Sequence, residues 1–202
     1  MDTFGKQGCD TLEDMEPALR RMTLEEYEAF EERSERPHEY RDGFAIGRTL
    51  PSPDHATISG SLVIAFGAAI RARGCRFFAE NGKVVVPGGD RLIPDFVATC
   101  DARDFERLRN PGEPLLCAPW LAVEILSPST AADDAVGKGR SYRSIPELTH
   151  YVMIDSRRRW VMVQERSSDG AFTMREPLEA IVLPNLPPST LEEIYRGTSV
   201  PA

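Results

Sequence analysis

The stretch that decides the fold is PWLAVEILSPST, residues 119–130, an apolar run interrupted by one glutamate. Continuous apolar and β-branched residues are typical of a strand that is buried on both faces of a sheet. Glu124 stands in the middle of this run, where a carboxylate is costly unless it is ion-paired or holds a cation. The sequence therefore predicts a central strand over residues 119–127 that carries either a functional acid or a buried ion pair.

The composition excludes several classes of protein. The chain has 202 residues, 41% hydrophobic and 28% charged, which is typical of a globular protein with a sizeable core. No apolar run approaches the roughly 18 residues that cross a bilayer, and residues 1–20 show no signal peptide, so we expect no membrane partner and a cytoplasmic location. The four cysteines lack metal-ligand spacing, which argues against a zinc site and favours reduced thiols. The net charge of −8 disfavours tight binding to DNA without metal.

Hydrophobic periodicity and turn residues predict a mixed α/β domain. Residues 1–20 are expected to form a flexible leader, followed by one domain over residues 21–197. A hairpin is expected around Asp42-Gly43, because this dipeptide favours a two-residue turn. Helices are expected over residues 22–33, 52–73, 131–144 and 191–195, and strands over residues 76–79, 83–86, 93–99, 149–155, 159–166 and 171–176.

Three acids lie on predicted strands: Glu39 in the hairpin, Asp95 after a proline, and Glu124 in the central strand. Carboxylates on neighbouring strands can converge, and one or two of them with waters hold Mg²⁺. A metal held in this way activates water for phosphodiester hydrolysis. Taken alone, Asp95 also fits a turn or strand-start residue, and Glu124 also fits a salt bridge to an arginine.

A helical face follows the central strand, because Thr130, Asp134, Lys138 and Tyr142 recur every four residues. On this face the Lys138 ammonium could point at a metal site, where it would orient the attacking water or stabilise negative charge. An exposed Asp134–Lys138 ion pair is the alternative interpretation, and the spacing alone leaves both open.

The motifs IPDF, AVEILSPST, D…K…Y at four-residue steps, and THYVMID resemble, in this order, the Uma-type restriction endonuclease family. That family is a bacterial branch of the PD-(D/E)XK nuclease superfamily, and the resemblance extends from Met22 to Tyr195. It implies a restriction-endonuclease-like fold: a mixed sheet flanked by helices, with an added N-terminal helix and hairpin.

The resemblance also implies roles for individual residues. Asp95 matches the aspartate of the PD motif and Glu124 the acid of (D/E)XK, both metal ligands, while Glu39 matches an early glutamate that completes the cation site. The lysine two residues after the acid is replaced by Leu126 here. A lysine displaced to the following helix matches Lys138.

Two further residues match less specific positions of the family. His55 matches a histidine near the start of the long helix, with either a site-lining or a structural role. Tyr142 is interpreted as a packing residue that lines the site rather than as a catalyst.

The implied function is a Mg²⁺-dependent endonuclease that hydrolyses phosphodiester bonds in DNA, with Mn²⁺ as a substitute cation. The resemblance also implies a homodimer. The alternative is a non-catalytic, DNA-associated or regulatory module that retains the nuclease fold. Metal binding by Asp95 and Glu124 separates the two hypotheses.

Overall fold

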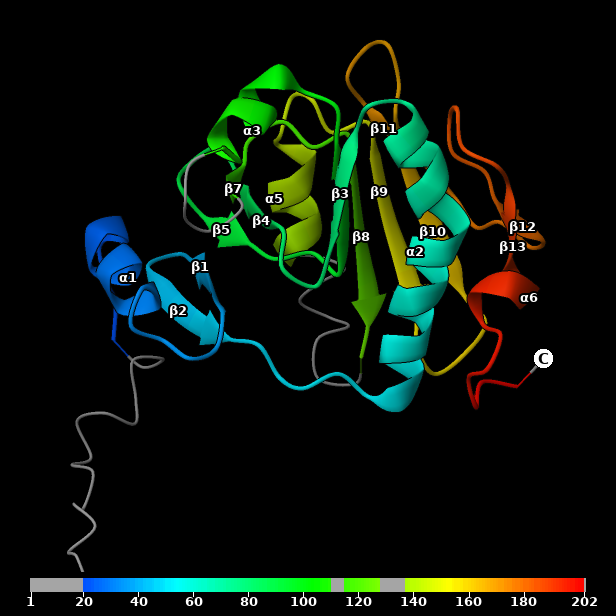
Figure 1. Ribbon diagram of the computed structural model, residues 1–202, viewed down its shortest axis with the longest axis horizontal. Coiled ribbons are helices and arrows are strands. Elements are labelled where there is room, and N and C mark those ends of the chain that lie inside the picture. Colours follow the sequence, from blue (N-terminus) through cyan, green and yellow to red (C-terminus); the bar gives the residue numbers. More distant parts are fainter. Residues whose placement is uncertain (1–19, 110–114, 128–136, 202) are drawn as a thin grey trace, which may run out of the picture. The chain divides into compact units, whose positions relative to one another are not determined.

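The computed structural model describes residues 20–109, 115–127 and 137–201, and the chain forms two compact units, Met1–Arg48 and Thr49–Ala202 (Figure 1). Each unit has a hydrophobic core of its own. Nearly all of the expected leader lies outside the described residues. The single domain expected over residues 21–197 stays a prediction.

The N-terminal unit consists of one helix and one hairpin: α1 (Leu24–Glu31), β1 (His38–Arg41) and β2 (Phe44–Gly47). A capping box starts α1, in which the Glu26 amide donates to Thr23 Oγ1 at 3.2 Å and the Thr23 amide donates to a Glu26 carboxylate oxygen at 2.8 Å. Asp42 and Gly43 both have positive φ, 50° and 86°, as a two-residue hairpin turn requires. The predicted helix and hairpin are therefore confirmed.

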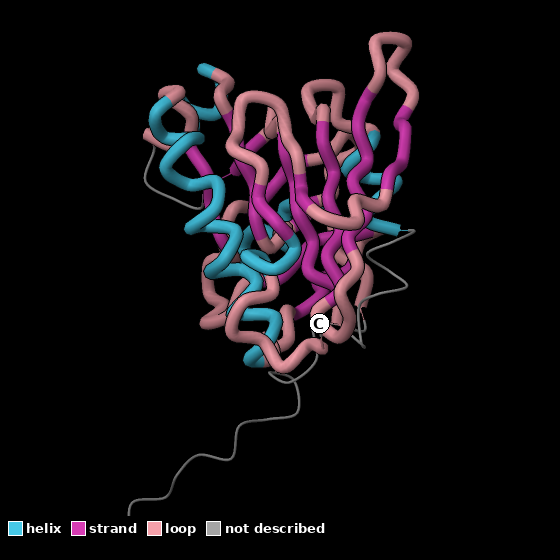
Figure 2. The backbone as a smooth tube through the Cα atoms, turned by 90° about the vertical axis from the view of Figure 1, so that its right-hand side faces the viewer, coloured by secondary structure: helices cyan, strands magenta, loops and turns pink. Residues whose placement is uncertain are grey.

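A six-stranded mixed sheet forms the centre of the second unit, and Figure 2 shows its strands side by side. Its order is β11 (Phe172–Arg175), β10 (Val161–Arg166), β9 (His150–Asp155), β8 (Leu121–Leu126), β6 (Phe96–Thr99) and β3 (Arg76–Ala79). The β8–β9 pair is parallel and all other neighbours are antiparallel. Every residue of β8 is buried, as predicted for the central strand.

Different elements cover the two faces of this sheet (Figure 1). Val123 and Ile125 of β8 pack in one core cluster with the long helix α2 (Pro53–Ala72) and the short helix α6 (Leu191–Ile194). Ala122 and Leu126 pack in a second cluster on the opposite face. That cluster includes α5 (Gly139–Arg143), β4 (Lys83–Val85), β5 (Arg91–Leu92) and β7 (Leu115–Leu116). The predicted mixed sheet with helices on both sides is confirmed.

The long helix α2 begins and ends where its sequence predicts. Ser52 Oγ accepts a 3.2 Å hydrogen bond from the His55 amide at the first turn, and Gly74, with φ of 74°, follows the last turn. A Cβ on Gly67 would lie 2.9 Å from Phe77 Cζ, so this glycine lets α2 approach β3 closely. Among the described residues, α2 is also long and apolar enough to cross a membrane, which was not expected from the sequence. Its buried side, however, belongs to the sheet core.

Short elements and strand ends differ from the predictions. The strand expected over residues 93–99 begins three residues later, because β6 runs from Phe96 to Thr99 and is preceded by Pro94, which has no amide to donate. The helix α3 (Ala102–Arg107) lies in a stretch expected to be a loop with one helical turn. Three short strands were not expected: β7, β12 (Ala180–Ile181) and β13 (Ser189–Thr190). Of the helix expected over residues 131–144, the first six residues lie outside the described part of the chain.

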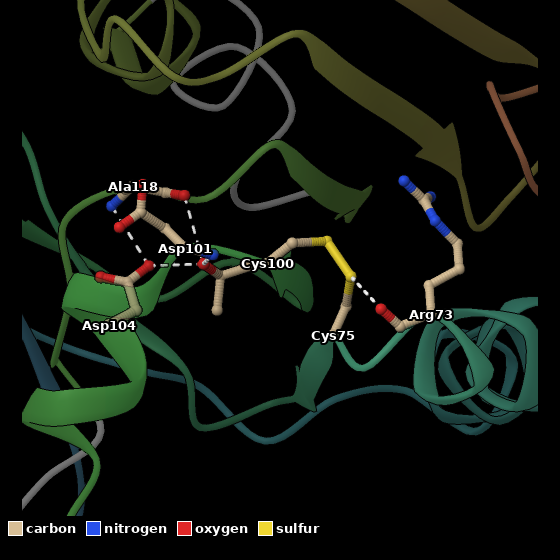
Figure 3. The surroundings of a disulfide bond; sticks show 7 residues. Arg73, Cys75, Cys100, Asp101, Asp104 and Ala118 are labelled. Carbon is tan, nitrogen blue, oxygen red and sulfur yellow. Dashed lines mark hydrogen bonds between the residues drawn. A yellow bond between two sulfur atoms is a disulfide. The ribbon is translucent and has the colours of Figure 1, made fainter.

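The cysteines correct another expectation, because Cys75 and Cys100 form a disulfide rather than remaining reduced (Figure 3). The reason is the strand register. Arg76 pairs with Thr99 in the antiparallel β3–β6 ladder, so the next residue outward on each strand faces the other. The Cα atoms of the two cysteines are 4.3 Å apart.

A buried polar network continues from Cys100 into α3 (Figure 3). Asp104 is fully buried, and its carboxylate accepts hydrogen bonds from Thr99 Oγ1 at 2.6 Å and from the Cys117 amide at 2.7 Å. Ala118 donates to the same carboxylate at 3.3 Å. This side chain therefore ties the end of β6 to residues 117 and 118, which precede β8.

Candidate functional site

Glu124 is 2% exposed and lies on the α5 face of the sheet, opposite to the face of Val123 and Ile125. The Tyr142 hydroxyl donates a 2.8 Å hydrogen bond to Glu124 Oε1, and Lys138 Nζ lies 3.4 Å from the same oxygen. The cost of burying this carboxylate is thus offset by one hydroxyl and one ammonium group. Of the two sequence interpretations of Glu124, a functional acid and a buried ion pair, the structure shows an ion pair, formed with Lys138.

The two partners of Glu124 come from one short segment. Lys138 directly precedes α5, and Tyr142 lies one turn later, so both side chains reach the same carboxylate. The predicted shared face of these two residues is confirmed. Asp134, the partner in the alternative ion pair, lies outside the described residues. Tyr142 was interpreted as a packing residue that lines the site, and its hydroxyl also donates a hydrogen bond to the acid.

Leu126 occupies the position at which the family motif has lysine. It is 5% exposed and packs in the second core cluster with residues such as Tyr151 and Met153. A lysine here would have to bury its ammonium among apolar side chains. The ammonium near Glu124 comes instead from Lys138.

Asp95 lies in the bend between β5 and β6 and is 3% exposed. Its Oδ2 accepts a 2.6 Å hydrogen bond from the backbone amide of Ile125, the residue after Glu124. Phe96 pairs with Val123 in the β6–β8 ladder, so Asp95 and Glu124 occupy the next opposed positions on adjacent strands. The two motif acids therefore lie at the same end of this strand pair.

The other oxygen of Asp95 faces two side chains from other elements. Asp95 Oδ1 lies 3.2 Å from Nε2 of His55, in the first turn of α2, and the same nitrogen lies 3.8 Å from Oε1 of Glu80, at the end of β3. One ligand atom from each of these three residues lies within 4.8 Å of the other two, so the group could hold a metal ion. His55 therefore has the site-lining position that the family resemblance allowed.

Glu80 was not expected at this site. It has a φ of 69°, which is uncommon for a residue other than glycine, and its amide donates a 2.9 Å hydrogen bond to the Asp95 carbonyl. The sequence offers one weak signal, an acid directly after a strand and before Asn81-Gly82. Its proximity to Asp95 depends on the β3–β6 register, which the sequence does not give.

Glu39 lies in β1 of the N-terminal unit, where it is buried, pairs with Ile46 and lies 3.6 Å from Arg41 Nε. Glu39 belongs to the N-terminal unit, whereas Asp95 and Glu124 belong to the second unit. A contribution of Glu39 to the cation site stays a prediction.

Comparison with known proteins identifies the family of the chain. Residues 24–198 match the family model Uma2, described as "Putative restriction endonuclease". The chain belongs to the Uma2 family. An uncharacterized protein of Synechocystis sp. is 32% identical over 151 residues, which cover 74% of this chain and 77% of that protein. The family membership expected from the sequence motifs is confirmed.

A solved structure supports the fold of this Uma2 chain independently of close sequence similarity. A protein of Anabaena variabilis, described as a "putative nuclease belonging to DUF820", has a TM-score of 0.70 at 18% identity. The similarity covers 86% of this chain and 97% of that chain. The restriction-endonuclease-like fold expected from the sequence is therefore confirmed.

Proposed function

We propose that this Uma2 protein is an endonuclease that hydrolyses phosphodiester bonds in DNA and depends on a divalent cation, with Mg²⁺ as the expected ion and Mn²⁺ as a substitute. One observation carries the proposal. Asp95 and Glu124, the two acids at the motif positions, lie at one end of adjacent strands and are joined through the Ile125 amide.

The residues at this end of the sheet fit a divalent cation. Carboxylate oxygens are the preferred ligands of Mg²⁺, and the Asp95 carboxylate has a second carboxylate, Glu80, and an imidazole within 4.8 Å. A bound cation would lower the pKa of water and neutralise charge on a phosphate. In the proposal Asp95 and Glu124 hold the cation, and Glu39 assists directly or through water.

The remaining residues orient these acids and the attacking water. The Ile125 amide holds Asp95 Oδ2, and the Tyr142 hydroxyl holds Glu124 Oε1. Lys138 lies beside the same oxygen, where its ammonium would position the nucleophilic water and stabilise the negative charge that develops on the phosphate.

The charge of the protein determines how DNA would bind. With a net charge of −8, the chain repels a polyanion, so contact depends on the cation and on local basic groups. We therefore expect DNA binding to be weak without a divalent cation. The homodimer expected from the family is part of the same proposal.

The test is cleavage of supercoiled plasmid and of single-stranded DNA with Mg²⁺ or Mn²⁺. Asp95→Asn and Glu124→Gln keep the shape of each side chain and remove its charge, and each should lower the cleavage rate by at least about 10²-fold. Glu106→Gln changes an exposed acid of α3 and serves as the matched control. Its cleavage rate should equal that of the unmodified protein.

Two outcomes would contradict the mechanism. Cleavage that survives both Asp95→Asn and Glu124→Gln would exclude these acids as cation ligands. A folded protein that binds DNA but cleaves none with either cation would favour the non-catalytic module. Cleavage of RNA but not DNA would overturn the proposed substrate while leaving the mechanism in place.

A further inference from the structure

The acid at the PD position is accompanied by a nitrogen donor and a second carboxylate. His55, Glu80 and Asp95 come from α2, the end of β3 and the start of β6, far apart in the sequence. We propose that His55 Nε2 and Glu80 join Asp95 and Glu124 in binding the cation of the proposed function. The site should therefore bind a first-row transition-metal dication such as Mn²⁺ more tightly than Mg²⁺, the ion expected from the family resemblance. This inference deepens the proposed function and rests on it for the role of the cation in catalysis.

Backbone hydrogen bonds place all three residues, and hold the Asp95 carboxylate, before any cation binds. His55 follows the Ser52 cap of α2, and the Glu80 amide is bonded to the Asp95 carbonyl. The Ile125 amide occupies Asp95 Oδ2, which leaves Oδ1 on the side of His55. A site assembled from three fixed elements loses little conformational freedom when it binds an ion.

The charges at this position match a dication better than a proton. Two carboxylates lie near one imidazole nitrogen, at 3.2 and 3.8 Å. A protonated imidazole supplies one positive charge, whereas a divalent cation supplies two and balances both acids. The N-terminus of α2 disfavours a nearby cation, but this partial charge is smaller than either carboxylate charge.

Exposure at the site leaves room for water and substrate. The side chains of His55 and Asp95 are 10% and 4% exposed, whereas that of Glu80 is 38% exposed. An ion held here is therefore enclosed on the side of the core and open on the side of Glu80. Open positions are what a hydrolytic metal site needs in addition to its protein ligands.

The nitrogen donor is the origin of the expected selectivity. Mg²⁺ binds oxygen ligands almost exclusively and gives up its waters reluctantly, whereas imidazole binds well to first-row transition metals. Mn²⁺ accepts carboxylates as well as imidazole, so it gains from His55 in addition to the acids. Mg²⁺ gains mainly from the carboxylates and binds the same position with lower affinity.

The experiment measures ion binding without DNA. Isothermal titration calorimetry with Mn²⁺ and with Mg²⁺, together with the loss of the free Mn²⁺ electron paramagnetic resonance signal, gives both affinities. The unmodified protein should bind Mn²⁺ at least about tenfold more tightly than Mg²⁺. His55→Gln should remove most of this difference by weakening Mn²⁺ binding while changing Mg²⁺ binding by less than about twofold.

Two further variants complete the set. Glu80→Gln should weaken the binding of both ions. His38→Gln changes a histidine of the N-terminal unit that pairs with Glu31, and it should leave the binding of both ions unchanged. Circular dichroism melting of every variant separates loss of a ligand from loss of the fold.

The inference is overturned if His55→Gln leaves the ratio of Mn²⁺ to Mg²⁺ affinity unchanged, even if the protein cleaves DNA. If the ratio depends on His55 but no DNA is cleaved, the proposed function fails and the cation site stands. The two failures are therefore distinguishable by separate measurements.

Discussion

The backbone amide of Ile125 donates a 2.6 Å hydrogen bond to Oδ2 of Asp95, which ties the PD-position acid to the residue that follows Glu124. One strand of the sheet thus carries the second acid of the family motif and also orients the first. Because a backbone amide is the donor, this contact persists when side chains around it are changed. A conservative substitution of Asp95 can therefore test its role as a ligand while this hydrogen bond is kept.

Asp95→Asn should remove cation binding while retaining the fold. The amide oxygen of asparagine can still accept from the Ile125 amide, but one negative charge near Glu80 is lost. Without metal, we expect the melting temperature to be unchanged or slightly higher. Added Mn²⁺, at 100 times its dissociation constant, should stabilise the unmodified protein by about 2.7 kcal/mol. Its melting temperature should therefore rise, whereas that of the variant should not.

Differential scanning fluorimetry with and without Mn²⁺ makes this measurement. A metal-induced shift of equal size in Asp95→Asn would contradict the assignment of Asp95 as a ligand.

Tyr142→Phe should destabilise the second unit, because it removes the 2.8 Å hydrogen bond to the buried Glu124 carboxylate. Hydrogen bonds to charged groups contribute roughly 1.5–3 kcal/mol, so we expect a loss of this size in the free energy of unfolding. The comparison variant is Tyr27→Phe, which removes a bond to the neutral His38 carbonyl.

Tyr27→Phe should lower the free energy of unfolding by about 1 kcal/mol. Urea unfolding gives both values. Equal losses would show that the charge of Glu124 adds nothing to the Tyr142 bond.

Opening the Cys75–Cys100 disulfide should lower stability. The bond closes a loop with a sequence separation of 25 residues, for which loop entropy corresponds to about 3 kcal/mol. For a chain of this size, a loss of that magnitude lowers the melting temperature by roughly 10 °C. The Cys75→Ser/Cys100→Ser protein should therefore melt as the reduced protein does.

Cys117 is a free, half-buried thiol, and Cys117→Ser serves as the control that leaves the disulfide intact. Alkylation without reductant, followed by mass spectrometry, should leave Cys75 and Cys100 unmodified. Modification of both in the native protein would contradict the pairing. The cytoplasmic location expected from the sequence stays a prediction.

The buried His150 should make stability fall in acid. Burial lowers the pKa of His150, with Glu165 partly opposing the shift. The unfolded chain takes up a proton near pH 6.5, about the ordinary value for histidine, which the folded protein resists. Stability is therefore fully present above that pH and is lost as the pH falls through the lower pKa of the folded state.

His150→Gln removes this titration, so its free energy of unfolding should fall less steeply between about pH 7.5 and 5. Urea unfolding at several pH values measures the slope. A slope identical to that of the unmodified protein would mean that His150 does not contribute to the acid dependence.

Local structure, such as turns and helix ends, was predictable from the sequence. The Thr23–Glu26 capping box, the Asp42-Gly43 turn and the Ser52 cap act between residues close in the chain. The turn and the two helices that these caps begin appear where they were expected. The buried strand around Glu124 was predictable for the same reason, because its composition alone indicates burial on both faces.

Contacts that depend on strand register were not predictable. Cys75 faces Cys100, and Glu80 joins Asp95, only because β3 and β6 pair with one particular alignment. A shift of one residue would turn every side chain of the strand to the other face. The family resemblance located Asp95 and Glu124, but it gave no indication of Glu80.

Leu126 has a consequence for how this sequence can change with time. Its side chain fills the core cluster at the position where the motif of the superfamily has lysine, and Lys138 brings an ammonium to Glu124 from α5. Lysine at position 126 would bury a charge among apolar side chains, and loss of Lys138 would remove the ammonium beside Glu124. Each single substitution is destabilising, so moving the ammonium from one position to the other requires both changes together.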